Sequence, residues 1–142
     1  MAERNTIQVD IVSAEGEIFS GAATMVFAPA SQGDIGVAPR HAPLLSMLKP
    51  GEVRVQTPGG EEHFFFVGGG AIEVQPQRVT VLADTALRAE DIDEAAALAA
   101  KQRAEEALKE RPGLITHAQA LTELARATAQ LKVLARLRKV RG

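Results

Sequence analysis

RVTVLADTALRAEDIDEAAALAAKQRA, residues 78–104, contains the boundary between two kinds of structure. In its first few residues apolar side chains recur at every second position, which is typical of a half-buried β-strand. After Arg88 alanine predominates, and alanine is the best helix former. Ten of the 12 glycines, six of the 7 prolines and all 5 phenylalanines precede Arg88, whereas residues 89–142 contain 14 alanines. The composition predicts a β domain over 1–88 and a helical domain over 89–142.

Short strands interrupted by glycine and proline are expected throughout residues 1–88. Apolar and polar residues alternate over 6–12 and 52–57, which predicts two strands with one buried side each. Similar short runs occupy 17–20, 24–28, 33–37, 63–67, 71–74 and 78–82. No helix of useful length fits between them, so an antiparallel β-sandwich is favoured over a βαβ fold. The whole chain is expected to be α+β with two domains.

Two helices are expected after Arg88, joined at Pro112-Gly113 into an antiparallel hairpin. The first covers about 90–110, with Asp91 as N-cap and Glu94 completing a capping box. The second covers about 116–139. The stripes expected to face each other are Ala97, Ala100, Ala104, Ala107 and Leu108 on the first helix, and Leu121, Leu124, Thr128, Leu131 and Leu134/Ala135 on the second. Such a hairpin buries little apolar surface by itself, so its stability should depend on docking.

The overall charge and the absence of cysteine exclude several classes of protein. The 142 residues carry a net charge of −2, which argues against a globally basic nucleic-acid binder. The sequence has no cysteine, so disulfides and cysteine-ligated zinc are excluded, and a reducing compartment fits. No apolar run is long enough to span a membrane, and residues 1–5 contain no apolar signal core. A soluble protein facing the cytoplasm is expected.

Charge is divided between the two halves of the chain. Residues 1–88 contain 6 basic and 10 acidic side chains, whereas residues 89–142 contain 10 basic and 8 acidic ones. The last eighteen residues are basic without an acidic side chain, through Arg126, Lys132, Arg136, Arg138, Lys139 and Arg141. Two interpretations stay open: a solvated helix end that complements the helix dipole, or a docking surface for an acidic partner.

No arrangement of residues indicates catalysis. The three histidines, His41, His63 and His117, are scattered without metal-ligand spacing, and no serine lies in a nucleophile elbow. The run 68–70 is all glycine but lacks the Lys-Ser/Thr of a phosphate loop, so a hairpin or bulge is expected there. The three phenylalanines at 64–66 are expected in the core and at a sheet edge. We therefore expect no enzyme, no metal and no cofactor.

Short motifs in a fixed order connect the chain to a known family. The motifs are VSAE (12–15), FSG (19–21), GDIG (33–36), HAPLL (41–45), KPG (49–51), EVQP (73–76), VTVLADTA (79–86), DEA (93–95), AEE (104–106) and AQLKV (129–133). In this order they resemble the epsilon subunits of bacterial F-type ATP synthases over essentially the whole chain. The family's architecture, a β-sandwich followed by a helical hairpin, agrees with the composition.

The resemblance implies a non-catalytic rotor subunit whose sandwich binds the gamma subunit and the ring of c-subunits. It would lie peripherally on the cytoplasmic face of the bacterial plasma (inner) membrane. The positions that match the family's ring-contacting loop are Ser31, Gln32, Gly33, Asp34 and His41. The positions that match its gamma-contacting surface are Ser13, Pro43, Leu44 and Ser46. No nucleic-acid partner is expected.

The resemblance also implies a regulatory role for the hairpin. In the family it either folds against the sandwich or extends along gamma into the alpha/beta catalytic head, where it blocks ATP hydrolysis. The inhibitory residues would be Arg126, Lys132, Arg136 and Lys139 on the second helix. Some family members bind ATP through a motif that begins at Ile92-Asp93 here, but its arginine is replaced by Ala96. At most a weak nucleotide site is expected.

Two other classes of function compete with this one. The first alternative is a free-standing β-sandwich adaptor whose basic helix end binds nucleic acid or acidic membrane lipid; it predicts salt-sensitive anion binding and no affinity for gamma. An enzyme is the third possibility, and it would need a metal or substrate pocket that the residues do not indicate.

Overall fold

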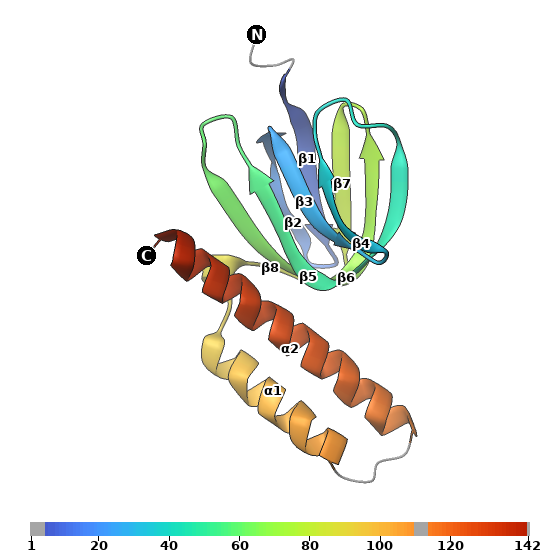
Figure 1. Cartoon of the computed structure of the whole chain (residues 1–142), viewed down its shortest axis with the longest axis vertical. Coiled ribbons are helices and arrows are strands. Elements are labelled where there is room, and N and C mark those ends of the chain that lie inside the picture. The colour runs from blue at the N-terminus through green and yellow to red at the C-terminus, as the bar shows by residue number, and fades with distance from the viewer. Residues whose placement is uncertain (1–4, 110–113, 142) are drawn as a thin grey trace.

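The computed structural model describes residues 5–109 and 114–141 as a β-sandwich with a helical hairpin docked at one end (Figure 1). The strands are β1 (Ile7–Ser13), β2 (Gly16–Ala23), β3 (Met25–Ala30), β4 (Gly33–Val37), β5 (Leu44–Gln56), β6 (Glu62–Gln75), β7 (Arg78–Ala83) and β8 (Ala86–Arg88). The helices are a 3-10 turn η2 (Ala89–Asp91), α1 (Glu94–Lys109) and α2 (Leu114–Arg141). The α+β fold class expected from the sequence is confirmed.

The strands form one continuous sheet that folds over on itself. Its order is β2-β1-β7-β6-β5-β3-β4, with β8 paired to β6. The pairs are antiparallel in the described part of the chain except for β1 and β7, which run parallel with Val9 opposite Val79. The expectation of a purely antiparallel sandwich is wrong at this pair. No tight turn connects β1 to β7, so nothing local imposes the antiparallel direction.

Strands β5 and β6 are longer than expected because each runs through both layers of the sandwich. Strand β6 pairs with β8 as far as Val67 and with β7 from Gly70 onward. Gly69 and Gly70 have φ of 114° and 131°, and a Cβ at Gly70 would lie 2.1 Å from the carbonyl oxygen of Leu82. The glycine run is therefore not a hairpin; it is the corner at which one strand bends from the first layer into the second.

Two apolar clusters lie on opposite sides of β6. The first fills the sandwich and includes Phe65, together with Ile7, Val9, Ile11, Val26, Val53, Val55, Ile72, Val74, Val79 and Val81. The second lies between the sandwich and α2, and its members are Phe64, Phe66, Ala89, Ile92, Ala129, Val133, Leu134 and Leu137. Successive side chains of a strand point to opposite faces, so three adjacent phenylalanines serve two different cores.

Helix α1 begins later than expected and uses a different cap. The carboxylate of Asp93 accepts a hydrogen bond from the backbone N–H of Ala96 at 3.1 Å, which makes Asp93 the N-cap. Asp91, the expected cap, lies in the preceding 3-10 turn. The chain between them is extended at Ile92, which is buried in the second cluster, and this burial delays the start of the helix.

Helix α2 buries a set of residues that overlaps the expected stripe only at Leu134. The alanine stripe of α1 is confirmed at Ala97 and Ala104, which are buried against α2. On α2, however, Leu121 is 49% exposed, and the buried positions are Ala120, Ala127, Ala129, Val133, Leu134 and Leu137. Of the expected stripe, Leu134 is among the buried positions and the others are not, because α2 packs against two partners, α1 and the sandwich, and therefore needs two apolar faces.

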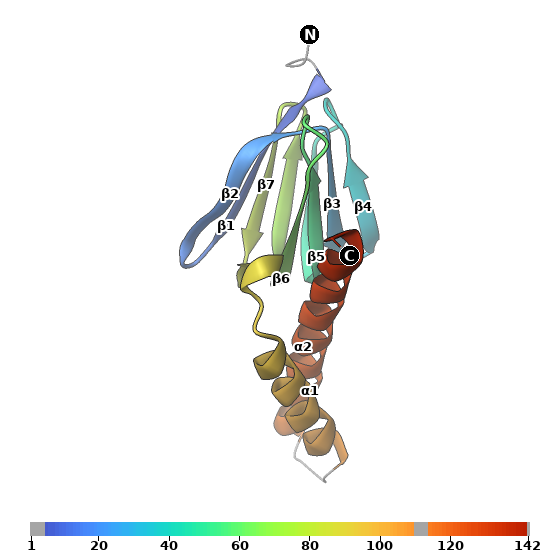
Figure 2. The same ribbon diagram turned by 90° about the vertical axis from the view of Figure 1, so that its left-hand side faces the viewer.

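The C-terminal half of α2 lies beside the sandwich, and its other half projects away with α1 (Figures 1 and 2). The main contacts of α2 with the sandwich are to β5 and β6. Among the described residues, neither helix combines the length and apolar character that would let it cross a membrane.

Asp10 on β1 is expected to stabilise the fold in a pH-dependent way. Its carboxylate accepts hydrogen bonds from Ser20 Oγ at 2.8 Å and Gln8 Nε2 at 3.1 Å, and it pairs with Arg78. Burial raises the pKa of Asp10, but these three partners outweigh burial and hold the pKa below the ordinary value of 3.8. A depressed pKa stabilises the folded state above the unfolded-state pKa, and this stabilisation is lost as the pH falls through the folded-state pKa.

Asp10→Asn is therefore expected to lower the free energy of unfolding by about 1 kcal/mol at neutral pH. The difference from wild type should shrink as the pH falls below 3.8. Urea titrations at neutral pH and at about pH 3 measure it, with Glu17→Gln, an exposed carboxylate change on β2, as the control. A difference that is equally large at both pH values would show that Asp10 acts through packing alone.

Candidate functional site

An exposed apolar surface covers the outer side of the sandwich. Leu45, Met47 and Leu82 are 74%, 62% and 55% exposed. Register pairs Met47 with Ala71, Ala71 with Leu82 and Leu82 with Val12, so these residues form a row across β5, β6, β7 and β1. We call Val12, Leu45, Met47, Ala71 and Leu82 the outer apolar face. Contiguous exposed apolar residues of this kind mark interaction sites.

The expected gamma-contacting residues flank the outer apolar face. Pro43 and Leu44 are exposed at the start of β5, and the hydroxyl of Ser46 donates to the carbonyl of Met47 at 3.0 Å. Ser13 follows Val12 at the end of β1. The expected residues thus lie on the same strands as this face, but Leu44 and Ser46 alternate with Leu45 and Met47 along β5 and pair with the core residues Val74 and Ile72, so their side chains point to the other side of the sheet.

Met47 and Leu82, two of the most exposed residues of this surface, were not among the residues selected from the sequence. A signal for Leu82 was present in the strand pattern. Val79 and Val81 alternate into the core, so the next residue, Leu82, has to point outward. For Met47 the signal was absent, because the sequence did not predict that β5 extends back to Leu44.

The expected ring-contacting residues are not all in one place. Ser31 and Gln32 are exposed in the β3–β4 turn, Gly33 begins β4 with φ of 136°, and Asp34 is exposed one residue later. His41 lies beyond the opposite end of β4, where its Nδ1 is 2.7 Å from the carbonyl oxygen of Ala42. A five-residue strand spans about 16 Å, so the turn and His41 are separate parts of the surface.

A groove of about 680 Å³ runs between α2 and the sandwich. One wall is formed by Leu121, Leu124, Thr128, Lys132 and Arg136 of α2, and the other by residues of β3, β4 and β5 that include Phe27, Pro29, Asp34, Lys49, Pro50 and Glu52. Leucines that were expected to face α1 thus line this groove. Of the expected inhibitory residues, Lys132 and Arg136 lie here; Arg126 and Lys139 are exposed elsewhere on α2.

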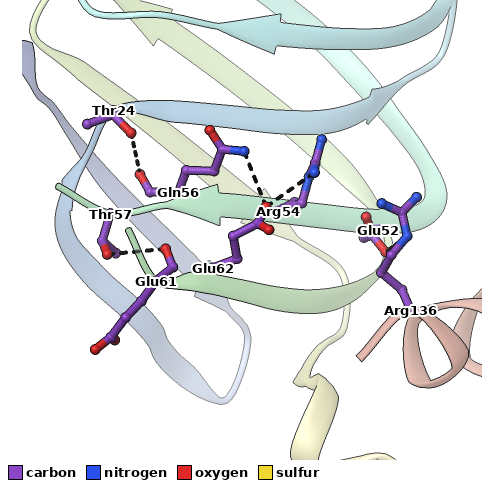
Figure 3. Close-up of polar contacts among 8 residues, drawn as sticks. All are labelled: Thr24, Glu52, Arg54, Gln56, Thr57, Glu61, Glu62 and Arg136. Carbon is purple, nitrogen blue, oxygen red and sulfur yellow. Dashed lines mark hydrogen bonds and ion pairs between the residues drawn. The ribbon is translucent and has the colours of Figure 1, made fainter. Parts of the chain in front are cut away.

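Three arginines near the end of α2 pair with carboxylates. Arg136 Nε is 4.0 Å from Glu52 Oε2 on β5, and Arg141 Nη2 is 3.9 Å from Glu90 Oε1 in η2. Arg138 pairs with Glu94 in the first turn of α1. The basic end of α2 is therefore in contact with acidic side chains of its own chain, as Figure 3 shows for Arg136 and Glu52.

Glu52 lies beside a second set of polar contacts on β5 and β6 (Figure 3). Arg54 Nη1 and Gln56 Nε2 both donate to Glu62 Oε2 at 3.2 Å, and the Arg54 guanidinium lies 4.1 Å from the centre of the Phe27 ring. Burial raises the pKa of Glu52, and Arg136 and Arg54 offset this only in part. Asp34 and Glu62 also raise the pKa of Glu52, because a nearby negative charge disfavours the ionised carboxylate.

The residues considered for a nucleotide have structural contacts in this chain. Ile92 is buried in the second cluster, and the Asp93 carboxylate caps α1. Within residues 5–109 and 114–141, no three His, Asp or Glu side chains are grouped closely enough to share a metal ion.

Family comparisons cover most of the chain. The family described as ATP synthase, Delta/Epsilon chain, beta-sandwich domain matches residues 6–89. The family described as ATP synthase, Delta/Epsilon chain, long alpha-helix domain matches residues 90–135.

Individual relatives and solved structures agree with these families. The ATP synthase epsilon chain of Nitrosococcus oceani is 65% identical over 137 residues, which are 96% of this chain and 98% of the relative. That of Halorhodospira halophila is 60% identical over 95% of this chain and 96% of the relative. In fold, the chain resembles one in the Euglena gracilis mitochondrial ATP synthase (OSCP/F1/c-ring), with TM-score 0.83, 20% identity and coverage of 92% and 82% of the two chains. It also resembles one in the Tetrahymena thermophila central stalk/c-ring, with TM-score 0.60, 14% identity and coverage of 90% and 96%.

Proposed function

Because this chain belongs to the delta/epsilon chain family of ATP synthases, as an epsilon-type, non-catalytic subunit of the central stalk, we propose that its two parts have different tasks. The sandwich binds gamma and the ring of c-subunits and makes them turn together. The hairpin inhibits ATP hydrolysis by reaching the alpha/beta catalytic head. The subunit is part of a membrane-associated complex and lies on the cytoplasmic face of the bacterial plasma membrane.

The outer apolar face carries the proposal for gamma. A monomeric protein would expose Leu45, Met47 and Leu82 to water. Other large apolar side chains of the sandwich are buried in its core. Burying exposed apolar surface contributes roughly 25 cal/mol for each Å². Pro43 and Ser13 lie at the ends of β5 and β1 beside this face, so a partner that covers the face would reach these two of the expected gamma residues.

The β3–β4 turn is the proposed ring contact. Ser31, Gln32 and Asp34 are exposed there, and they are polar, as suits the headgroup-level surface of a membrane rotor. His41 lies beyond the opposite end of β4. It would need a different part of the ring, or another subunit, as its partner.

The basic end of α2 is the proposed inhibitory surface. Lys132 and Arg136 are four residues apart and share a helix face, so they can meet one acidic surface of the head. Reaching the head requires the C-terminal half of α2 to leave the sandwich. That step exposes Phe64 and Phe66, which sets its free-energy cost.

A charge on the outer apolar face is expected to abolish gamma binding without unfolding the subunit. Met47→Glu and Leu82→Glu place a carboxylate within the proposed interface, where it would be desolvated without a partner. Each is expected to weaken gamma binding by roughly a hundredfold, about 3 kcal/mol, measured by titration calorimetry. The matched control is Leu98→Glu on α1, another exposed leucine. If both variants bind gamma as wild type does, the proposed function of this face is wrong.

A further inference from the structure

The end of α2 is held by carboxylates from three different elements. Glu52 belongs to β5, Glu90 to η2 and Glu94 to α1. They pair with Arg136, Arg141 and Arg138. The first pair connects the hairpin to the sandwich, and the other two close the hairpin where the end of α2 passes the start of α1. We call Glu52, Glu90 and Glu94 the acidic clamp.

Glu52 is the member whose environment depends most on docking. Its side chain is 23% exposed beside the groove, and its partner Arg136 is 47% exposed on the other wall. The charged groups around it are Arg136 of α2, Arg54 on its own strand, Asp34 of β4 and Glu62 of β6. Arg54 already pairs with Glu62, so the docked helix supplies the cation that is directed to Glu52. A half-buried carboxylate is unfavourable unless a cation compensates it.

We propose that the acidic clamp restrains the hairpin in its docked position, and that Glu52 within it competes with the inhibitory contact for Arg136. The proposal rests on the proposed function in one respect, which is that the basic end of α2 acts on an acidic surface elsewhere. Arg136 is a member of both contacts, so it cannot pair with Glu52 and with the catalytic head at once. A stronger clamp then means weaker inhibition, and a broken clamp means stronger inhibition.

The clamp acts separately from the apolar contact beneath α2. Phe64 and Phe66 pack against the buried side of α2, whereas Glu52 meets Arg136 at the edge of the groove. Apolar packing does not depend on which residue of the pair carries the positive charge. Exchanging the charges of Glu52 and Arg136 therefore tests the clamp and leaves the apolar packing unchanged. The chain permits this exchange because Glu52 and Arg136 form a pair of opposite charges on two elements.

The first experiment measures docking in the isolated full-length chain by hydrogen exchange of the backbone amides of residues 129–137. Glu52→Lys and Arg136→Glu each replace an attraction by a repulsion, and each is expected to accelerate exchange about tenfold. The double variant Glu52→Lys/Arg136→Glu restores opposite charges, and its exchange is expected within about twofold of wild type. The control is Glu105→Lys, the same charge change at an exposed position nearer the other end of α1.

Arg136→Glu lies on an exposed helix position, so it keeps the test valid if Glu52→Lys disturbs the sandwich. Wild-type exchange in both single variants would overturn the clamp, and so would a double variant as fast as the single ones. The second experiment measures ATP hydrolysis in the assembled enzyme with Glu52→Lys, which leaves every arginine of α2 in place. Stronger inhibition by about tenfold supports the competition. Faster exchange without stronger inhibition would leave the clamp as a docking contact and overturn the proposed inhibitory role instead.

Discussion

Replacing Phe65 by alanine is expected to unfold the sandwich, whereas the same change at Phe64 or Phe66 releases the hairpin. Phe65 belongs to the sandwich cluster and meets the Phe19 ring edge-on, with ring centres 5.5 Å apart. Phe64 and Phe66 belong to the cluster under α2. A buried Phe→Ala change costs about 3–5 kcal/mol, because apolar contact is lost and a cavity remains. For Phe65 that amount is a large fraction of the total stability of a small domain.

The three variants are each other's controls, since they have the same chemistry on adjacent residues. Urea denaturation followed by circular dichroism should show a lower midpoint of the β transition for Phe65→Ala. For Phe64→Ala and Phe66→Ala, hydrogen exchange should accelerate in α2 while the strands stay protected. If Phe64→Ala destabilises the strands as much as Phe65→Ala does, the two clusters are one cooperative core.

Removing residues 90–142 is expected to increase ATP hydrolysis by the assembled enzyme, if the hairpin is inhibitory as proposed. The sandwich should stay folded, because its core cluster uses no side chain beyond Ala86. We expect roughly a tenfold or larger increase, since several ion pairs of ~0–1 kcal/mol each add up to a bias of that size. Steady-state hydrolysis by otherwise identical complexes measures it. Equal rates with and without the hairpin would refute the inhibitory role.

Changing Lys132, Arg136 and Lys139 together to glutamate tests whether charge is the cause. The triple change should relieve inhibition almost as fully as truncation, whereas single alanine changes should have little effect. It also breaks the pair between Arg136 and Glu52, which loosens docking. Loosened docking alone would strengthen inhibition, so relief in this variant can only come from lost contacts with the head. Added salt should mimic part of the effect.

Patterns that are local along the chain were sufficient for much of this structure. Alternation over 6–12 and the alanines after Arg88 predicted strand and helix, because side-chain periods of 2.0 and 3.6 are properties of a single segment. The ordered motifs predicted the family, and the comparisons agree. The alanine face of α1 was also predictable, since one partner helix covers it.

Contacts between distant segments were not predictable in the same way. Phe64, Phe65 and Phe66 look alike in sequence, and they are assigned to two cores only because β6 has α2 on one side and the sandwich interior on the other. The parallel pairing of β1 with β7 likewise needs the sheet to close, which no local pattern encodes. The second apolar face of α2 is buried only when the helix is docked on the sandwich, so the sequence of the helix alone does not identify it.

The candidate surfaces divide in the same manner. The exposed β3–β4 turn and the basic end of α2 follow from residue type and order, because turns and charges are local properties. Chain folding brings Met47 and Leu82 to the two sides of Ala71 on one face, and Arg136 beside Glu52, across 35 and 84 positions of sequence. Whether such remote residues meet depends on the register of the strands and on the docking of α2. The register is set when the whole sheet closes, and the docking is set by the packing of α2 on the sheet.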